Sequence, residues 1–435
     1  MITRKWIERI EGEASVQFTF EHNKVSFATI AFPHFRGMEA ILYSKPAMDA
    51  LVITPRVCGI CGHSHLFAAV RAIESVYANN GFPLEISPKA QAIRELTLSL
   101  ELIQNHFKWL YLVIYPELSH LVKRPIADSF RLKGAYAASI ATKVLAIFAG
   151  QWPHSSYMIP GGVTCDPTYV DTVRAMGLLD ELIRWFEKEL TGISLEEYLH
   201  LSSTKALSRL TGDMGDLDKM LRIANMHKQG FSYDRYCVLG EHGFSKPSKN
   251  INKRTTKVNA KQVTLENPYT VDEKTYAKNA LYQNNPFETG PLARAMTNGV
   301  PFIKHLHRSF HDSTYTRIMA RSYEIPLLLE HCKTLLHSLH LDEPSFIEPH
   351  KKITSLSGEG VGIVEAPRGP LMHKVTLNKG IIDNYTLITP TQWNLSCGSP
   401  QTPGPAQKAM IGADSIETAT FTFRAFDVCS VCTTH

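Results

Sequence analysis

Residues 56–65 read RVCGICGHSH, and residues 427–435 read DVCSVCTTH. These two stretches hold four cysteines in two C-x-x-C pairs, each followed by histidine: Cys58, Cys61, Cys429 and Cys432. This spacing can place two thiolates on one metal ion, and Gly59 and Gly62 let the backbone turn tightly around it. The pairs lie near opposite ends of the chain, so a site made from all four thiolates forms only when the whole chain folds.

Three kinds of site are compatible with such cysteines. A structural zinc site with four cysteine ligands is the simplest, but zinc ribbons keep their pairs within a few tens of residues. A dithiol redox pair would need a βαβ context, which surrounds neither pair. A catalytic transition metal is the third, because soft thiolates suit such ions. The remaining cysteines are scattered and are expected to be small buried apolar residues: Cys165, Cys237, Cys332 and Cys397.

The composition is that of a globular protein with a full core. Of 435 residues, 44% are hydrophobic and 20% charged, and the formal net charge is only +5. Lysine and arginine are spread along the chain, which predicts neither a nucleic-acid partner nor an anionic membrane surface. The one basic stretch, 246–262, has no interleaved aromatic residues and is interpreted as a solvated insertion loop.

The sequence predicts no direct membrane span and no signal peptide. The N-terminal residues MITRKWIERIEGE have no apolar core, and the longest charge-free run, 144–165, contains Pro153 and Pro160. We therefore expect a cytoplasmic location, with any export or membrane attachment coming through a partner.

Periodicity predicts a mostly helical α+β fold. Alternating residues on both sides of His22-Asn23-Lys24 predict a hairpin over about 14–32, and helical periodicity follows the first cysteine pair as far as Gly81. Ser87-Pro88 is typical of a helix start and opens a long helix. Further helices are expected over about 169–190 and 313–340, the latter kinked at Pro326, and short strands over about 353–390.

We interpret residues 1–435 as a single domain. It would comprise four parts: the hairpin at about 14–32, a helical core at about 62–345, a small β region at about 353–395 and a C-terminal tail at 424–435 that carries metal ligands.

The sequence resembles the large, catalytic subunit of nickel–iron hydrogenases. Both cysteine stretches match that family's signature motifs, and the supporting motifs follow in the expected order: RIEG at 9–12, RGME at 36–39, PH followed by PGGV at 153–163, GPLAR at 290–294, EAPRG at 365–369 and TPTQWN at 389–394. The resemblance therefore spans nearly the whole chain.

The resemblance implies a bimetallic centre on the four cysteines. Cys58, Cys61, Cys429 and Cys432 would hold nickel. Cys61 and Cys432 would also bridge to an iron that carries one carbon monoxide and two cyanide ligands. Thiolates are good bridging donors, and such a centre polarises dihydrogen so that it can be split.

Proton handling would fall to residues beside these thiolates. The terminal thiolate of Cys429 is one candidate base. Arg368, poised over the site by Pro367, is the other, although a guanidinium normally stays protonated, so we rank it first as an electrostatic stabiliser and cyanide hydrogen-bond donor. Glu11 would relay the proton away, and Asp427 would pair with Arg368 and orient it.

The resemblance assigns further supporting residues. His65 would hydrogen-bond a bridging sulfur, and Thr391 would lie near a cyanide nitrogen. Glu39 and His435, with a backbone carbonyl near Leu387, would bind a buried magnesium or similar hard cation that anchors the C-terminal segment.

This chain departs from the family pattern at several positions. Val428 replaces the usual proline after Asp427, and Asn105-His106 stands where Asp-His is common. Glu13 occupies a position where histidine is frequent. The loss of the aspartate removes one carboxylate from the expected surroundings of Arg368, which makes the charge balance there a question for the structure.

We expect a hydrogenase catalytic subunit that reversibly splits dihydrogen into protons and electrons. It would form an obligate heterodimer with an iron–sulfur small subunit, because the four scattered cysteines cannot hold a cluster. One alternative is a hydrogen-sensing subunit with slow turnover; coding sequence beyond His435 would argue against it. The second alternative, the quinone-site subunit of respiratory complex I, lacks the cysteine pairs.

Overall fold

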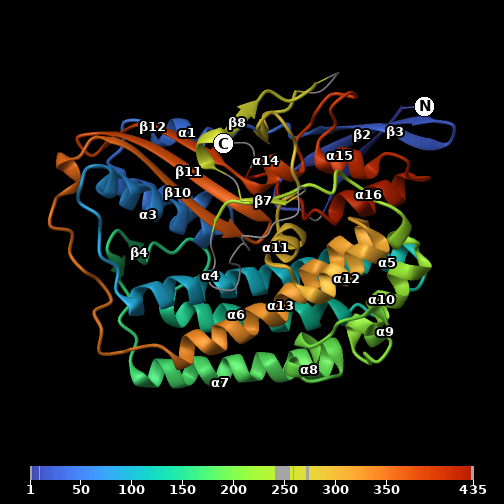
Figure 1. The fold of residues 1–435 in the computed structure, drawn as a ribbon, viewed down its shortest axis with the longest axis horizontal. Helices are drawn as coiled ribbons and strands as arrows, with labels where there is room; N and C mark the ends of the chain where they lie inside the picture. The colour runs from blue at the N-terminus through green and yellow to red at the C-terminus, as the bar shows by residue number, and fades with distance from the viewer. Residues whose placement is uncertain (1, 9, 241–254, 258, 271–273, 433–435) are drawn as a thin grey trace.

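The computed structural model describes residues 2–8, 10–240, 255–257, 259–270 and 274–432. Long helices are stacked in the lower half of Figure 1, and the larger sheets lie in the upper half, where segments from both ends of the chain meet. This arrangement confirms the predicted α+β class with a mostly helical body.

The N-terminal residues form a three-stranded antiparallel sheet in the order β1-β2-β3, with bounds Ile2–Ile7, Ala14–Glu21 and Lys24–Ala31. The predicted hairpin is β2–β3, whose turn residues His22 and Asn23 both have positive φ, as a two-residue hairpin loop with the strand twist requires. The sequence analysis missed β1. Most of its side chains are at least partly exposed, so it carries no apolar alternation.

Helix α3, Gly62–Asn79, follows the first cysteine pair and packs against a second antiparallel sheet, β10-β11-β12. The strands span Gly358–Ala366, Gly369–Asn378 and Ile381–Ile388. Gly360 and Gly362 face the helix at very short range: a Cβ at these positions would lie 2.1 Å from the Ala72 carbonyl oxygen and 2.0 Å from that of Ala68. Because Gly360 and Gly362 have no side chains, the backbones of β10 and α3 can come into contact at these two positions.

The body consists of long helices that cross the lower half of Figure 1. Helix α4 packs against α6 and α13, and α7 packs against α6 and α13. Their bounds are Pro88–Lys108 for α4, Phe130–Ala149 for α6, Tyr169–Trp185 for α7 and Thr314–His337 for α13. The predicted cap is present, since Ser87 Oγ accepts a hydrogen bond from the Ala90 amide at 3.1 Å. Pro326 lies inside α13, and the kink expected there stays a prediction.

Helix α6 was not predicted. It is apolar nearly all round, and Ser129 before it makes no side-chain cap. It is also the one helix among the described residues that is long and apolar enough to cross a membrane. Half of that segment is buried, and Gly134 lies against the side chain of Tyr111, so one side of α6 packs into the helical body.

Shorter elements complete the fold. The remaining helices are α1 Met38–Leu42, α2 Ala50–Ile53, α5 Tyr115–Leu121, α8 Leu195–Leu199, α9 Thr204–Leu207, α10 Asp213–Ile223, α11 Pro291–Asn298, α12 Pro301–Phe310, α14 Pro390–Asn394, α15 Pro405–Met410 and α16 Ile416–Arg424. The remaining strands are β4 Met158–Ile159, β5 Gly162–Val163, β6 Tyr236–Val238, β7 Thr255–Lys257, β8 Val263–Glu266 and β9 Asn279–Tyr282. Two π-helical turns, Trp109–Ile114 and Phe186–Thr191, extend α4 and α7.

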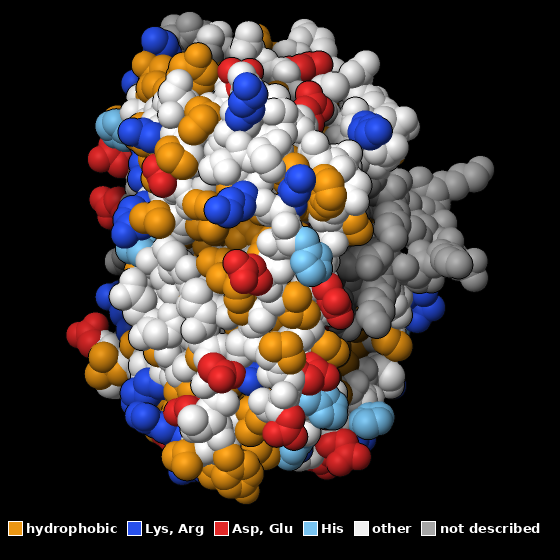
Figure 2. All heavy atoms as spheres, turned by 90° about the vertical axis from the view of Figure 1, so that its left-hand side faces the viewer, with side chains coloured by type: hydrophobic (Ala, Val, Ile, Leu, Met, Phe, Trp, Pro, Cys, Tyr) orange, Lys and Arg blue, Asp and Glu red, His pale blue; other side chains and the backbone are white. Residues whose placement is uncertain are grey.

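The largest apolar core lies among the long helices, α3 and the β10–β12 sheet. A second core joins the N-terminal sheet to α15 and α16. The single-domain organisation stays a prediction. On the face shown in Figure 2, positive and negative side chains are interspersed with apolar ones, without a field of one sign. Most of the basic stretch 246–262 lies outside the described residues.

Candidate metal centre

The first cysteine pair lies at the start of α3. Cys58 has extended backbone after the 3-10 turn Thr54–Val57, and Cys61 is the residue before the helix, so its side chain lies at the positive end of the helix dipole. The positive helix end acts in favour of a thiolate at Cys61 and so opposes the neighbouring thiols, which raise its pKa.

A buried carboxylate from α4 holds this end of α3. Glu101 accepts hydrogen bonds from the amides of His63 and Ser64 at 2.9 and 3.0 Å and from Ser64 Oγ at 2.6 Å. Burial raises the pKa of Glu101, while these hydrogen bonds act in the opposite direction. Glu101 thus satisfies free amides of the first turn beside Cys61.

The second pair follows α16 and lies against the N-terminal segment. Glu11 and Cys429 form a parallel β-bridge, in which the Ser430 amide donates to the Glu11 carbonyl at 2.9 Å. Gly12 lies so close that a Cβ there would be 2.2 Å from Ser430 Oγ. Segments at the two ends of the sequence are therefore joined at the cysteines.

Arg36, in the RGME motif, ties the two cysteine segments together. Its Nη1 donates to the Val57 carbonyl and, at 3.3 Å, to the carbonyl of Val431. Arg36 was not among the predicted site residues, although it lies in the RGME motif.

The four thiols form one buried cluster. Sulfur–sulfur distances are 3.7 Å for Cys58–Cys429, 3.6 Å for Cys61–Cys432 and 3.2 Å for Cys429–Cys432, and none of these thiols is in a disulfide. Four sulfurs about 2.3 Å from a common ion would be about 3.8 Å apart, so the cluster has the dimensions of a metal site.

The buried cysteines of the cluster can all be thiolates only if a cation compensates their charge. Burial and the Cys429 thiol raise the pKa of Cys58, and thiol hydrogen bonds and burial raise those of Cys61 and Cys432. Hydrogen bonds from the same thiols, with help from Arg368, hold the pKa of Cys429 well below its ordinary value. Several thiolates cannot coexist here without added positive charge, and their softness suits a transition-metal ion.

Two overlapping ligand groups share Cys432. One comprises Cys58, Cys429 and Cys432, and the other comprises Cys61, His65 and Cys432. His65 Nε2 lies 3.8 Å from Cys432 Sγ, so the predicted contact between this histidine and a bridging sulfur has the required geometry.

Arg368 projects from a tight turn and pairs with Asp427. Ala366 and Gly369 are paired residues of β10 and β11, which makes Pro367 and Arg368 the two-residue hairpin loop. Arg368 Nε lies 3.0 Å from the Asp427 carbonyl oxygen and 2.9 Å from Oδ2. Burial lowers the pKa of Arg368, but the negative charges of Asp427 and the cysteines raise it by more. The net result is a pKa well above the ordinary value.

Buried polar atoms without a hydrogen-bond partner among the described residues include two in the EAPRG and TPTQWN motifs. Arg368 Nη1 and Thr391 Oγ1 make no hydrogen bond with any described residue. Buried donors are normally satisfied, so a group bound beside them is expected to accept from them.

Asn105 and Arg321 each line a pocket together with Arg368, and neither supplies the carboxylate that the missing aspartate would have given. Asn105 donates to the Ile60 carbonyl at 2.5 Å and so lies beside the first pair. On the other side, Arg321 lies 2.5 Å from Asp427 and donates to His106 at 3.0 Å.

The network continues into the core. Arg294, in GPLAR, pairs with Glu324 at 2.7 Å and with Glu365, in EAPRG, at 3.0 Å, and it donates to the Ala366 and Pro367 carbonyls. Three guanidinium groups (Arg294, Arg321 and Arg368) therefore face three carboxylates (Glu324, Glu365 and Asp427). Membership of quoted motifs was the available signal for Arg294 and Glu365.

Glu11 lies between the cysteine segments and a pocket. Its carboxylate is next to Gly59, where a Cβ would be 2.9 Å from Oε1. The pocket has a volume of about 400 Å³, and its lining includes Glu11, Ile60, Lys108, Arg131, Arg368 and Asp427. Because Arg131 is exposed, this pocket links the surroundings of the cysteines with the surface.

The predicted magnesium ligands are placed in part. Glu39, in the first turn of α1, accepts a hydrogen bond from the Leu387 amide at 2.8 Å, which brings these two residues together. His435 lies outside the described residues. The hard-cation site therefore stays a prediction.

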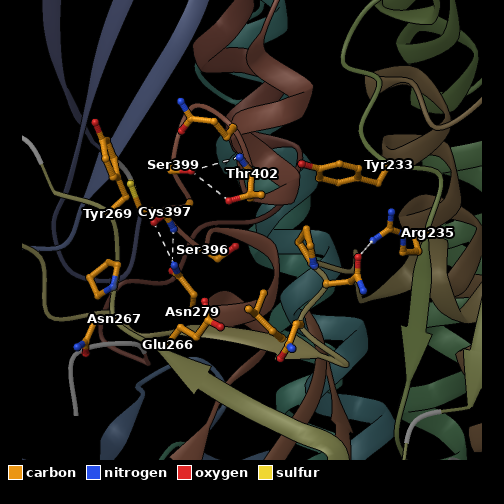
Figure 3. Close-up of a pocket in the computed structure, with 18 residues that line it drawn as sticks. Tyr233, Arg235, Glu266, Asn267, Tyr269, Asn279, Ser396, Cys397, Ser399 and Thr402 are labelled. Carbon is orange, nitrogen blue, oxygen red and sulfur yellow. Dashed lines mark hydrogen bonds between the residues drawn. The ribbon is translucent and has the colours of Figure 1, made fainter.

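A separate pocket of about 540 Å³ contains none of the predicted site residues (Figure 3). It lies beside β8, β9 and the 396–404 segment. Its polar side chains have partners within the protein: Ser399 Oγ bonds Thr402 Oγ1, and Asn279 Nδ2 donates to the Cys397 carbonyl.

The fold brings four thiols from the two cysteine pairs into one buried cluster that has the dimensions of a metal site, as in a metalloprotein. The sequence pattern described as nickel-dependent hydrogenase matches residues 36–115 and 240–435, more than half of the chain, and the protein belongs to this family. The centre is accordingly a nickel-containing one.

Relatives cover essentially the whole chain. Sulfhydrogenase 1 subunit alpha of Pyrococcus furiosus is 24% identical, over 100% of this chain and 97% of the relative. The large subunit of the periplasmic [NiFeSe] hydrogenase of Desulfomicrobium baculatum is 24% identical, over 93% and 88%. The structure of a reduced, active form of the latter organism's enzyme superposes with a TM-score of 0.82 at 20% identity, covering all of both chains. The expected family and fold are thereby confirmed.

Proposed function

We propose that this chain is the catalytic subunit of a hydrogenase that reversibly cleaves dihydrogen into two protons and two electrons. The observation that carries the proposal is the buried cluster of four thiols beside Arg368 and Glu11. Family membership and the names of the relatives, which are hydrogenase subunits, agree with it.

The centre would be dinuclear. Cys58 and Cys429 would bind nickel alone, while Cys61 and Cys432 would bridge to iron. When bound, the nickel and an iron with carbon monoxide and two cyanide ligands supply polarisation of dihydrogen and acceptance of its electrons. Two overlapping ligand groups that share Cys432 support two adjacent ions. The unpartnered Arg368 Nη1 and Thr391 Oγ1 are suited to donate to cyanide nitrogens.

The chain would move the proton through two paired residues. Cys429 Sγ would receive it and the Glu11 carboxylate would carry it towards the pocket. The β-bridge that pairs these residues, and the pocket bordered by Glu11, support this route. Arg368 would remain protonated against Asp427 and act as an electrostatic stabiliser rather than as the base.

A hard cation such as magnesium would bind near Glu39, Leu387 and His435. The contact of Glu39 with the Leu387 amide supports the proximity of two of these residues. A carboxylate with backbone oxygens and waters suits such an ion.

Electrons would leave through an iron–sulfur small subunit. In the segment before Cys58, five large apolar side chains are exposed by 39–60%: Phe35, Ile41, Tyr43, Met48 and Val52. Several exposed apolar side chains in one segment favour a protein partner, and a partner bound to this segment would lie close to the first cysteine pair. Val52→Asp is expected to weaken association with the small subunit, whereas Val170→Asp, on exposed α7, is not.

Infrared spectroscopy with metal analysis tests the central proposal. The purified complex is expected to contain nickel and iron and to show bands of iron-bound carbon monoxide and cyanide. Cys61→Ser should abolish the bands, and Cys397→Ser, at a buried cysteine outside the cluster, should preserve them. Folded protein with zinc in the cysteines and no such bands would refute the proposal.

A further inference from the structure

A chain of buried side chains leads away from the cluster. His65 Nε2 lies 3.8 Å from Cys432 Sγ, and His65 Nδ1 lies 3.1 Å from His373 Nε2. His373 Nδ1 lies 2.8 Å from the Tyr385 hydroxyl. The three residues come from α3, β11 and β12 and are almost fully buried, so water does not compete for these contacts.

The thiolate and the phenol both favour one direction for these hydrogen bonds. A neutral imidazole has one N–H donor and one acceptor nitrogen, and burial disfavours the charged ring. A metal-bound thiolate has no proton, so His65 must point its Nε2–H at Cys432 to avoid placing a lone pair against the sulfur. His65 Nδ1 is then an acceptor and requires Nε2–H on His373.

Tyr385 completes the chain. With its proton on Nε2, His373 needs a donor at Nδ1, and the Tyr385 hydroxyl supplies it. Burial raises the pKa of Tyr385, so the hydroxyl keeps its proton. In the reverse direction the chain would end with the Nε2 lone pair of His65 facing the sulfur, which suits a thiol but not a metal-bound thiolate.

We propose that His373 and Tyr385 are positioning residues that hold His65 as a hydrogen-bond donor to the bridging thiolate of Cys432. This inference rests on the proposed function, since it concerns sulfur bound to the metals. A donated hydrogen bond withdraws electron density from a thiolate, and supporting contacts of this kind tune a metal centre. Tyr385 thus influences the electron density of the centre without touching it.

The test is the infrared spectrum of the holoenzyme with its partner subunit. Tyr385→Phe removes one hydroxyl and releases His373 into either tautomer, so the thiolate becomes a stronger donor and the carbon monoxide band should move to lower wavenumber at unchanged nickel content. Replacing Tyr385 by 3-fluorotyrosine makes the hydroxyl a stronger donor and should move the band the other way.

Matched variants separate this effect from general loss of packing. Tyr323→Phe removes another buried hydroxyl, which donates to the Leu199 carbonyl at 2.7 Å, and should leave the bands in place. His373→Gln keeps one donor and one acceptor and should shift the band less than His373→Phe.

Each outcome bears on one of the two proposals. Unchanged bands in both Tyr385→Phe and the 3-fluorotyrosine protein would overturn the positioning role. If Tyr385→Phe does not assemble the centre, the 3-fluorotyrosine protein decides alone, because it keeps the hydroxyl. Absence of the bands from the wild-type holoenzyme would instead refute the proposed function.

Discussion

The Glu11 carbonyl accepts a hydrogen bond from the Ser430 amide at 2.9 Å, which fixes the N-terminal segment against the second cysteine pair. This contact uses only backbone atoms. The Glu11 side chain therefore takes no part in this bridge, and a substitution of the carboxylate can test its role in proton transfer separately.

Glu11→Gln is expected to slow isotope exchange between hydrogen gas and solvent at least tenfold, because an amide cannot carry the proton, while nickel content stays normal. The exchange is followed by mass spectrometry of the gas in heavy water. Glu13→Gln is the matched control, since Glu13 is exposed and bonds His34. Normal exchange in Glu11→Gln would remove Glu11 from the proton route.

Arg368→Lys should leave the metals assembled and reduce turnover by at least a hundredfold. An ammonium cannot reproduce the several contacts of the guanidinium with Asp427 and also fill the position of the unpartnered Nη1. Metal analysis and hydrogen uptake are measured on the same preparation. Wild-type turnover in this variant would contradict the assigned role.

Gly362→Ala should destabilise the fold by about 1–3 kcal/mol, because its Cβ would lie 2.0 Å from the Ala68 carbonyl oxygen and force β10 away from α3. Gly177→Ala, on an exposed face of α7 with open space around it, should be neutral or stabilise by up to about 1 kcal/mol. Urea unfolding measures both. Equal effects would mean that β10 and α3 separate easily.

Acid should destabilise the protein through His106. Burial, with Arg321, lowers the pKa of His106 from 6.5 to about 4, so the ring is neutral in the folded protein at a pH where the unfolded chain binds a proton. This contribution is complete above pH 6.5 and is lost as the pH falls towards 4, by roughly 3 kcal/mol in total.

Urea midpoints at several pH values between 7 and 4 measure this effect. His106→Gln should flatten the acid slope, because an amide can accept from Arg321 and donate to Glu324 without titrating. His200→Gln, at an exposed position, should not alter the slope. An unchanged slope in His106→Gln would assign the acid sensitivity elsewhere.

Local patterns in the sequence predicted the elements that carry strong local signals. Ser87-Pro88 marked the start of α4, and the turn at His22-Asn23 marked the hairpin. Helix α6 lacks both a side-chain cap and a polar face, and β1 lacks a buried face, so neither has a periodic signal.

Some residues of the site could likewise be predicted from the sequence, and others could not. The cysteine pairs could be found from spacing alone, and the resemblance supplied the pairing of Arg368 with Asp427. Glu101 and Arg321 could not be found, because each is one polar residue within a long helix. Their partners, Ser64 and Asp427, become neighbours only through tertiary packing.

The bridge between Glu11 and Cys429 also limits when the metal site can be completed during synthesis of the chain. At about 5–20 residues per second, the 371 positions from Cys58 to Cys429 take roughly 20–75 s to translate. During that interval the first pair emerges with half of its ligand set and with no second strand for Glu11. Metal binding must therefore either follow synthesis of Cys429 and Cys432 or begin on Cys58 and Cys61 alone. In the second case the last two thiolates bind an ion that is already in place.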